Sequence, residues 1–143
     1  MLVVVGALFI FVLIAVDFSR VEPYAYPLHL LKEKPYELYP GVWVGGYLHG
    51  DELIYFVKSK RINRVISLLN ERMYHEKSLV LYERRVLRRI GVRFYSIPMT
   101  PFVREPNKLR KVRNIVSRSK GVYIHSYLGR LRVKYVKEVL NAK

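Results

Sequence analysis

Four short runs rich in β-branched and aromatic residues alternate along the chain with longer segments whose apolar residues recur at helical spacing. The strand-like runs occupy residues 42–46, 64–69, 92–97 and 121–125. Helical segments follow them at residues 51–60, 78–90, 106–116 and 133–140. Regular alternation of strands and helices predicts an α/β fold, with a small central sheet flanked by helices. At 143 residues the chain is long enough for one such domain and too short for two.

Local signals mark the ends of these helices. Ser78 is a residue type that caps helix N-termini, and Gly91 suits the left-handed turn that often follows a helix. Pro106 suits the first turn of a helix, where its missing N–H group is not needed. We therefore expect one helix to begin at Ser78 and stop at Gly91, and another to begin at Pro106.

The first sixteen residues, MLVVVGALFIFVLIAV, contain no charged or strongly polar side chain. As a helix they would be about 24 Å long, close to the ~30 Å hydrocarbon core of a bilayer if Phe18 is added. We predict a transmembrane anchor over residues 1–18, with a cleaved signal peptide and a buried core helix as alternatives. Lys and Arg occur only after this segment. The positive-inside tendency then predicts a single-pass cell-membrane protein with its N-terminus outside and its folded part in the cytoplasm.

Residues 19–40 contain four prolines and four tyrosines among charges of both signs. The prolines exclude a long helix. One interpretation is a juxtamembrane connector whose tyrosines lie at the lipid headgroups, and the other is a strap packed on the folded domain. The predicted organisation is therefore an anchor over 1–18, a connector over 19–40 and a domain over 41–143.

The C-terminal part of the chain is strongly basic. Residues 57–143 carry 23 Lys and Arg against 5 Glu, a net charge of +18, whereas the first 56 residues carry −3, which gives +15 in all. Such a charge attracts nucleic acid, anionic lipid or small phosphate esters without choosing among them. The chain has no cysteine and its four histidines are scattered, so we predict no metal site and no cofactor.

The segment His125–Arg132 joins the last predicted strand to the last helix. Ligands of α/β sheets collect at such junctions, where helix N-termini offer free N–H groups. Gly129 allows the backbone to turn several amides toward one centre, and Arg132 can donate two parallel hydrogen bonds to phosphate oxygens. These residues predict a phosphate-binding loop; the alternative is a plain turn whose arginines are solvated.

The spacing His-Ser-x-x-Gly-x-x-Arg resembles the signature loop of the protein tyrosine phosphatase superfamily, His-Cys-x5-Arg. The stretches "YPGVWVGGY", "INRVISLLNE" and "GVRFYSIPM" are similar to strands of its dual-specificity members. Within that group, "SLLNERMYHE" followed by "LRRIGVRFYSIPMT" resembles the mitochondrial-type phosphatases that act on phosphatidylglycerophosphate. The resemblance implies a cysteinyl-phosphate mechanism.

The resemblance also implies roles for residues of the loop. Ser126 stands at the nucleophile position, Arg132 would bind phosphate and stabilise the transition state, and His125 would orient the loop. The implied phosphate-binding loop consists of Ser126, Tyr127, Leu128, Gly129, Arg130, Leu131 and Arg132.

The chain departs from the family pattern at three points. A serine hydroxyl cannot replace the family's thiolate, Val133 follows the arginine where Ser or Thr is usual, and the loop at 98–106 lacks the usual aspartate. In that loop Glu105 is the possible general acid, with Thr100 as a weaker substitute. Either the natural nucleophile has been exchanged for serine, giving an inactive substrate-trapping form, or the chain is a natural pseudophosphatase.

A membrane tether and a basic domain favour a phosphorylated headgroup of an anionic phospholipid as the substrate, with a phosphorylated protein as the alternative. Glu71, His75 and Thr100 are candidate substrate contacts; for Glu71 and His75 the other interpretation is a polar loop before a helix. A nucleic-acid-binding module is the second alternative function, but neither the apolar segment nor the loop spacing is needed for it. The sequence does not determine the oligomeric state.

Overall fold

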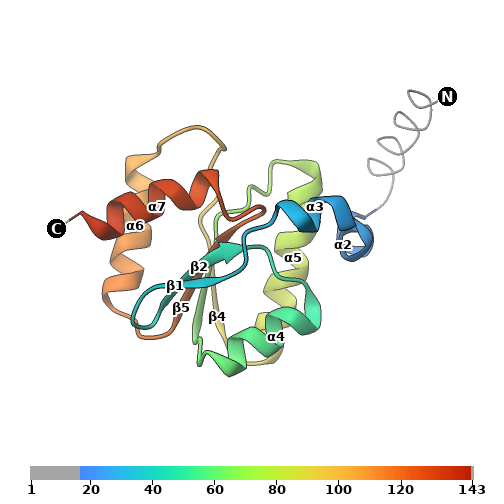
Figure 1. Ribbon diagram of the computed structural model, residues 1–143, viewed down its shortest axis with the longest axis horizontal. Coiled ribbons are helices and arrows are strands. Elements are labelled where there is room, and N and C mark those ends of the chain that lie inside the picture. The colour runs from blue at the N-terminus through green and yellow to red at the C-terminus, as the bar shows by residue number, and fades with distance from the viewer. Residues whose placement is uncertain (1–16, 143) are drawn as a thin grey trace.

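The computed structural model describes residues 17–142 (Figure 1). Its centre is a five-stranded sheet in the order β1-β2-β5-β3-β4. The strands are β1 (Tyr36–Tyr39), β2 (Val42–Gly46), β3 (Arg64–Ser67), β4 (Arg93–Ser96) and β5 (Val122–Ser126). β1 pairs antiparallel with β2, and the other pairs are parallel. The predicted α/β class with a small central sheet is confirmed, and β5 lies between β2 and β3.

Helices cover both faces of this sheet. They are α4 (Gly50–Ser59) and α5 (Tyr74–Arg89) on one face and α6 (Pro106–Ser117) and α7 (Leu131–Asn141) on the other (Figure 1). Because successive strand residues point to opposite faces, Val65 of β3 packs in the cluster under α4 and α5, whereas Ile66 packs in the cluster under α6 and α7. The continuous apolar runs read from the sequence are those of strands buried on both sides.

The helix ends agree with the local signals in part. Pro106 occupies the first turn of α6, and Gly91 follows α5 with a φ of +74°. The expected start at Ser78 is wrong, because α5 begins four residues earlier, at Tyr74. The additional turn contains Glu76, which is buried and bonded to groups outside its own helix. Tertiary contacts therefore extend this helix beyond the position of the capping residue.

Residues 17–40 pack on the domain as a strap of short elements. They form α2 (Phe18–Val21), a 3-10 turn at Glu22–Tyr24, α3 (Tyr26–Leu31) and β1. Phe18 is buried in a cluster with Leu79 and Val80 of α5. Of the two interpretations of this segment, the structure has the packed strap, and the folded unit extends N-terminal to the predicted boundary at residue 41.

Strand β1 was not expected, because Pro35 and Pro40 bracket its four residues. Such prolines are tolerated here since β1 is an edge strand and needs partners on one side only. Of the predicted transmembrane segment, residues 1–16 lie outside the described residues. Between residues 17 and 142, no helix combines the length and the apolar character needed to cross a membrane.

Candidate active site

The turn between β5 and α7 directs backbone amides toward one centre. The carbonyl of Tyr127 accepts a hydrogen bond from the Tyr47 amide at 3.0 Å, and the carbonyl of Leu128 accepts one from the Glu33 amide at 2.8 Å. Both carbonyls therefore point out of the loop, toward β2 and the strap. In a trans peptide the C=O and the following N–H point in opposite directions, so the amides of Leu128 and Gly129 face inward. Consistently, the Gly129 amide donates to Ser126 Oγ at 3.1 Å.

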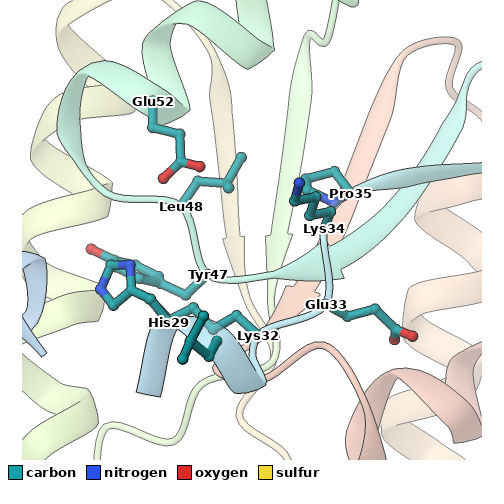
Figure 2. A pocket seen from close by; sticks show the side chains of 9 residues that line it. His29, Lys32, Glu33, Lys34, Pro35, Tyr47, Leu48 and Glu52 are labelled. Atoms are coloured by element: carbon teal, nitrogen blue, oxygen red, sulfur yellow. The ribbon is translucent and has the colours of Figure 1, made fainter. Parts of the chain in front are cut away.

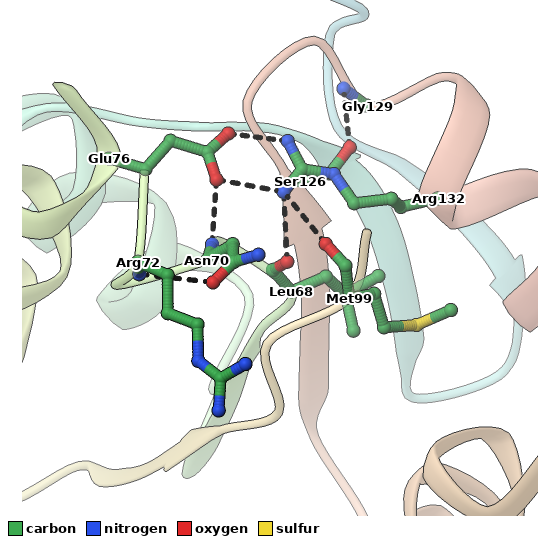
Figure 3. Close-up of polar contacts among 8 residues, drawn as sticks. All are labelled: Leu68, Asn70, Arg72, Glu76, Met99, Ser126, Gly129 and Arg132. Atoms are coloured by element: carbon green, nitrogen blue, oxygen red, sulfur yellow. Dashed lines mark hydrogen bonds and ion pairs between the residues drawn. The ribbon is translucent and has the colours of Figure 1, made fainter. Parts of the chain in front are cut away.

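The guanidinium of Arg132 lies in the first turn of α7 and is 6% exposed. Its Nη1 donates to Glu76 Oε2 at 2.9 Å and to the Leu68 carbonyl at 3.0 Å, with the Met99 carbonyl at 3.4 Å, and its Nη2 donates to Glu76 Oε1 at 2.5 Å (Figure 3). Glu76 is itself fixed by the Asn70 amide, which donates to Oε2 at 2.6 Å. The bidentate pair holds the side chain in one orientation.

A guanidinium has five N–H donors, and these contacts leave two of them free. Within residues 17–142, Nε–H and the second N–H of Nη2 of Arg132 have no acceptor. The two free N–H groups, on Nε and Nη2, point in the same direction from one edge of the planar group. This edge lies on the side away from Nη1 and its contacts. An edge with two parallel donors has the geometry needed to bind two oxygens of a phosphate.

His125 supports the loop from inside the sheet. Its Nε2 donates to Glu83 Oε1 of α5 at 2.6 Å, and both side chains are fully buried. The imidazole also stacks on the ring of Tyr123, with 5.4 Å between centroids. This placement agrees with a role in orienting the loop. Among residues 17–142 the other ring nitrogen, Nδ1, has no hydrogen-bond partner, so His125 makes no hydrogen bond to Ser126.

A cavity of about 190 Å³ opens in front of the loop. Its lining residues are Met73, His75, Glu76, Pro101, Ser126, Tyr127, Leu128, Leu131 and Arg132. Ser126, Arg132, His75 and Glu76 bring polar groups to it, and the other lining side chains are largely apolar. The cavity therefore suits an anion attached to a largely apolar group.

The other candidate residues read from the sequence differ in their placement. Glu71 Oε1 pairs with Arg84 at 2.7 Å on the surface and does not line the cavity. His75 does line it, with its ring edge-on to Phe18 at 5.9 Å between centroids. His75 is thus retained as a candidate substrate contact, and Glu71 is not.

Glu105 lies just before α6 and not in the cavity. Its Oε1 contacts Lys108 Nζ at 2.7 Å, and its Oε2 accepts from the Thr100 amide at 2.9 Å. The hydrogen bond from Lys108 lowers the pKa of Glu105, and the bond from Thr100 adds to this effect. A carboxyl group stabilised as the anion is a poor proton donor. Neither Glu105 nor Thr100 lines the cavity, so neither occupies the position of a general acid.

Glu76 and Glu83 are functional residues that the sequence interpretation missed. A signal for them exists, because Glu76, Val80, Glu83 and Leu87 form one buried stripe along α5. Carboxylates in an apolar stripe need buried partners, since burial of an unpaired charge is costly. The partners here are Arg132 and His125, the two outer residues of the sequence motif.

A second cavity, of about 250 Å³, lies between the strap and the end of β2 (Figure 2). Two lysines, two glutamates and a histidine are among its lining residues, a mixture that selects neither sign of ion. Lys32, one of them, contacts the buried Glu22 carboxylate and lies over the ring of Tyr127 at 4.8 Å. Burial lowers the pKa of Lys32 to about 8. Because Tyr127 belongs to the phosphate loop, Lys32 links the strap to that loop.

Comparison with known proteins identifies the fold. No protein-family model and no curated protein matches the chain. Among solved structures, a cysteine-to-serine variant of TpbA from P. aeruginosa in complex with phosphotyrosine is 18% identical with a TM-score of 0.54, and covers 69% of this chain and 56% of its own. The catalytic core of Siw14, a PP-IP phosphatase of S. cerevisiae, is 17% identical with a TM-score of 0.59, and covers 72% and 61%.

A DUF442 protein described as a phosphatase, from Shewanella putrefaciens, is 13% identical with a TM-score of 0.61, and covers 81% of this chain and 75% of its own. The chain thus spans less than two thirds of the length of TpbA and of the Siw14 core. At these identities the likeness shows the fold, which is that of protein-tyrosine-phosphatase-like phosphatases.

Proposed function

We propose that this domain binds the dianion of a phosphate monoester in the loop Ser126–Arg132, and that it hydrolyses the ester when residue 126 is cysteine. One observation carries the proposal: Glu76 holds Arg132 so that its Nε–Nη2 edge stays free, in the same cavity as the loop whose amides face inward. Two parallel N–H donors, backbone amides and a helix N-terminus together form a strong oxyanion site.

Ser126 does not support catalysis in the chain as given. Its Oγ accepts a hydrogen bond from Gly129, which would stabilise an anion but cannot remove a proton. Among the described residues neither His125, whose Nε2 bonds to Glu83, nor His75 makes a hydrogen bond to Ser126 Oγ. Without a base the hydroxyl stays protonated at neutral pH and attacks phosphorus poorly. The given chain would therefore bind substrate without turnover, either as an exchanged-nucleophile form or as a natural pseudophosphatase.

With cysteine at position 126 the reaction would have two steps. The thiolate sulfur forms a bond to phosphorus as the ester oxygen leaves with its electron pair and takes up a proton. Water then attacks the cysteinyl phosphate and releases inorganic phosphate and the thiolate. Arg132 and the loop amides would bind the three equatorial oxygens, whose charge they stabilise in both transition states.

His75 is the proton donor that we propose for the leaving oxygen. Among the residues that line the cavity, Glu76 has the carboxyl group, and it is committed to Arg132. Proton donation contributes about 10²- to 10⁴-fold to such reactions. Esters with poor leaving groups would depend on it most.

For the substrate we propose a phosphorylated headgroup of an anionic phospholipid, such as phosphatidylglycerophosphate. The apolar wall of the cavity, the net charge of +15 and the apolar sequence of residues 1–16 support this choice. The proposal also includes membrane anchoring by residues 1–18, with the folded domain on the cytoplasmic side of the membrane. The phosphotyrosine bound by TpbA and the PP-IP activity of Siw14 define two competing substrate classes.

The test compares the given chain with its Ser126→Cys variant, and adds Arg132→Lys to the variant as a control. Phosphate release would be measured from para-nitrophenyl phosphate, phosphatidylglycerophosphate, phosphoinositides and a phosphotyrosine peptide. We expect release only with cysteine and a large loss with lysine at position 132, because lysine lacks the two-donor edge.

Binding of tungstate to the given chain, measured by calorimetry, should be lost in Arg132→Lys. The chain has no other cysteine, so alkylation of the Ser126→Cys variant would report on this one thiol. Tungstate binding without turnover in the cysteine form would identify a pseudophosphatase. Absence of both binding and turnover would refute the phosphate site.

A further inference from the structure

Five large apolar side chains on segments next to the phosphate loop are exposed to solvent. They are Leu30 (67%), Leu31 (53%), Phe102 (76%), Val103 (47%) and Leu131 (42%). Leu131 lines the phosphate cavity, and Leu30 lines the cavity beside the strap. We call these five residues the apolar collar. Scattered exposed apolar residues are ordinary, but a group on neighbouring segments indicates an interaction surface.

The collar residues belong to three segments that meet at the loop. The Leu31 carbonyl accepts a hydrogen bond from Arg130 Nε at 3.1 Å, which joins α3 to the phosphate loop. Leu131 and Pro101 line the same cavity, and Phe102 follows Pro101 directly. Figure 1 shows α3, the loop before α6 and the turn before α7 at the end of the sheet where the parallel strands finish.

Phe102 is held outward by an unfavourable backbone conformation. Its φ is +64°, in the left-handed region that bulky residues rarely adopt. The ring gains nothing from burial in this position, because it is 76% exposed. A strained backbone that presents an aromatic ring to solvent favours a functional role for the ring.

The charges around the collar are predominantly positive. Arg72, Arg104 and Arg130 are exposed in three neighbouring loops, and of these Arg104 pairs with Glu138 at 3.7 Å. The carboxylates of two of these loops are already paired, Glu71 with Arg84 and Glu105 with Lys108. The collar therefore combines apolar side chains with arginines, the composition that binds the boundary between headgroups and acyl chains of anionic bilayers.

The path of the chain points to the same partner. Phe18, the second described residue, packs against Tyr127 of the phosphate loop at 5.9 Å between ring centroids. The apolar sequence of residues 1–16 thus leads into a residue that packs on the phosphate loop. A second copy of the chain is a less suitable partner, because each copy carries a net charge of +15.

We propose that the apolar collar inserts into the surface of an anionic bilayer, so that the phosphate cavity opens directly onto the lipid headgroups. This contact is additional to any anchoring by residues 1–18. It does not require hydrolysis, so it stands or falls separately from the proposed reaction.

The absence of native cysteine allows a direct test with single labels on the full chain. Val103→Cys places a fluorophore in the collar, and Lys120→Cys places one just before β5, at the opposite end of that strand from Ser126. Both residues are exposed. Each labelled chain would be added to vesicles of phosphatidylcholine alone and to vesicles that also contain phosphatidylglycerol, and iodide quenching and emission wavelength would be recorded.

We expect the label at 103 to shift to the blue in anionic vesicles and to lose most of its quenching by iodide, while the label at 120 changes little. Leu30→Ser combined with Phe102→Ser should restore quenching at 103, since each removed apolar contact weakens insertion by about tenfold or more. Tungstate binding by the same variants in the absence of vesicles should be unchanged, because neither residue lines the phosphate cavity.

Equal behaviour of the two labels would overturn the proposal. Shielding of the label at 103 from iodide before vesicles are added would also overturn it. Shielding that does not depend on protein concentration would place residues 1–16 over the collar. Shielding that does depend on it would place a second copy of the chain there. Loss of tungstate binding in every form, with insertion intact, would leave the membrane contact standing and remove the proposed reaction instead.

Discussion

A methyl group on Gly129 would lie 2.4 Å from the carbonyl carbon of Gly45, and Gly129 has a φ of +74°. The phosphate loop therefore lies directly on the end of β2, with no room for a side chain at their closest approach. Gly46 is also confined, since its methyl would lie 3.2 Å from the Tyr127 carbonyl oxygen. The glycine pair that ends β2 thus belongs to the site, as the surface on which the loop is shaped.

We expect Gly129→Ala to destabilise the fold by about 2–5 kcal/mol, through backbone strain of ~1–2 kcal/mol and overpacking of ~1–3 kcal/mol. Tungstate binding should be lost with it. Gly91→Ala is the matched control, because Gly91 has the same φ of +74° and no atom within 4 Å of the added methyl. Gly91→Ala should lower the free energy of unfolding by the backbone strain alone, ~1–2 kcal/mol. Denaturant unfolding of both variants measures the difference, and equal losses would mean that the contact with β2 is unimportant.

The ion pair between Glu76 and Arg132 gives a second prediction. Glu76→Gln leaves the Arg132 charge buried and half paired, which should cost about 3–5 kcal/mol of unfolding free energy. The guanidinium would also lose the contact that fixes its orientation, so tungstate should bind at least tenfold more weakly wherever the variant still folds.

Glu71→Gln is the control for this variant. It removes a carboxylate from the same loop region, but one that is paired with Arg84 at the surface. We expect a change of about 0.5 kcal/mol or less and no effect on tungstate binding. If both variants behaved alike, the buried pair would not be what positions Arg132.

Glu105 yields a prediction about pH. Its folded-state pKa is lowered below the ordinary 4.5 by the hydrogen bond from Lys108 and then by the Thr100 amide. Its contribution to stability is therefore fully present above about pH 4.5 and disappears as the pH falls through the folded-state pKa. Glu105→Gln should cost roughly 0.5 kcal/mol at pH 7, as expected for an exposed pair, and nothing in strong acid.

The same substitution separates this structural role from catalysis. In the Ser126→Cys background, Glu105→Gln should leave the turnover of both alkyl and aryl phosphates within about twofold. A loss of 10²-fold or more on alkyl phosphates would restore Glu105 as the general acid.

The parts of the structure that were predictable from the sequence depend on local patterns. Strands β2 to β5 and helix α6 could be located because their apolar periodicity and their glycine and proline signals are local. The phosphate loop could be located because its spacing joins a strand end to a helix start. Strand β1 could not, since four residues between prolines are too few to establish a strand pattern and are held by pairing with β2 and by packing of Tyr36 and Leu38 on the core.

The partners of the loop were not predictable for a related reason. Glu76 and Glu83 come from a helix about fifty residues before the loop, and nothing local distinguishes them from surface carboxylates. Only the phase of the helix does so, because both lie on its buried stripe. Because α5 begins at Tyr74, Glu76 belongs to the helix, but it lies outside the helix expected from Ser78. The periodicity of the expected helix therefore did not include Glu76.

His75 provides the most direct test of the proposed chemistry. In the Ser126→Cys chain, His75→Ala should lower the turnover of an alkyl phosphate by about 10²-fold or more, and that of para-nitrophenyl phosphate by less than about tenfold, because a good leaving group needs little protonation. Tyr74→Ala is the control: Tyr74 is the exposed neighbour of His75 and does not line the cavity. Equal losses on both substrates would instead assign His75 to binding, through its contact with Phe18 and the cavity wall.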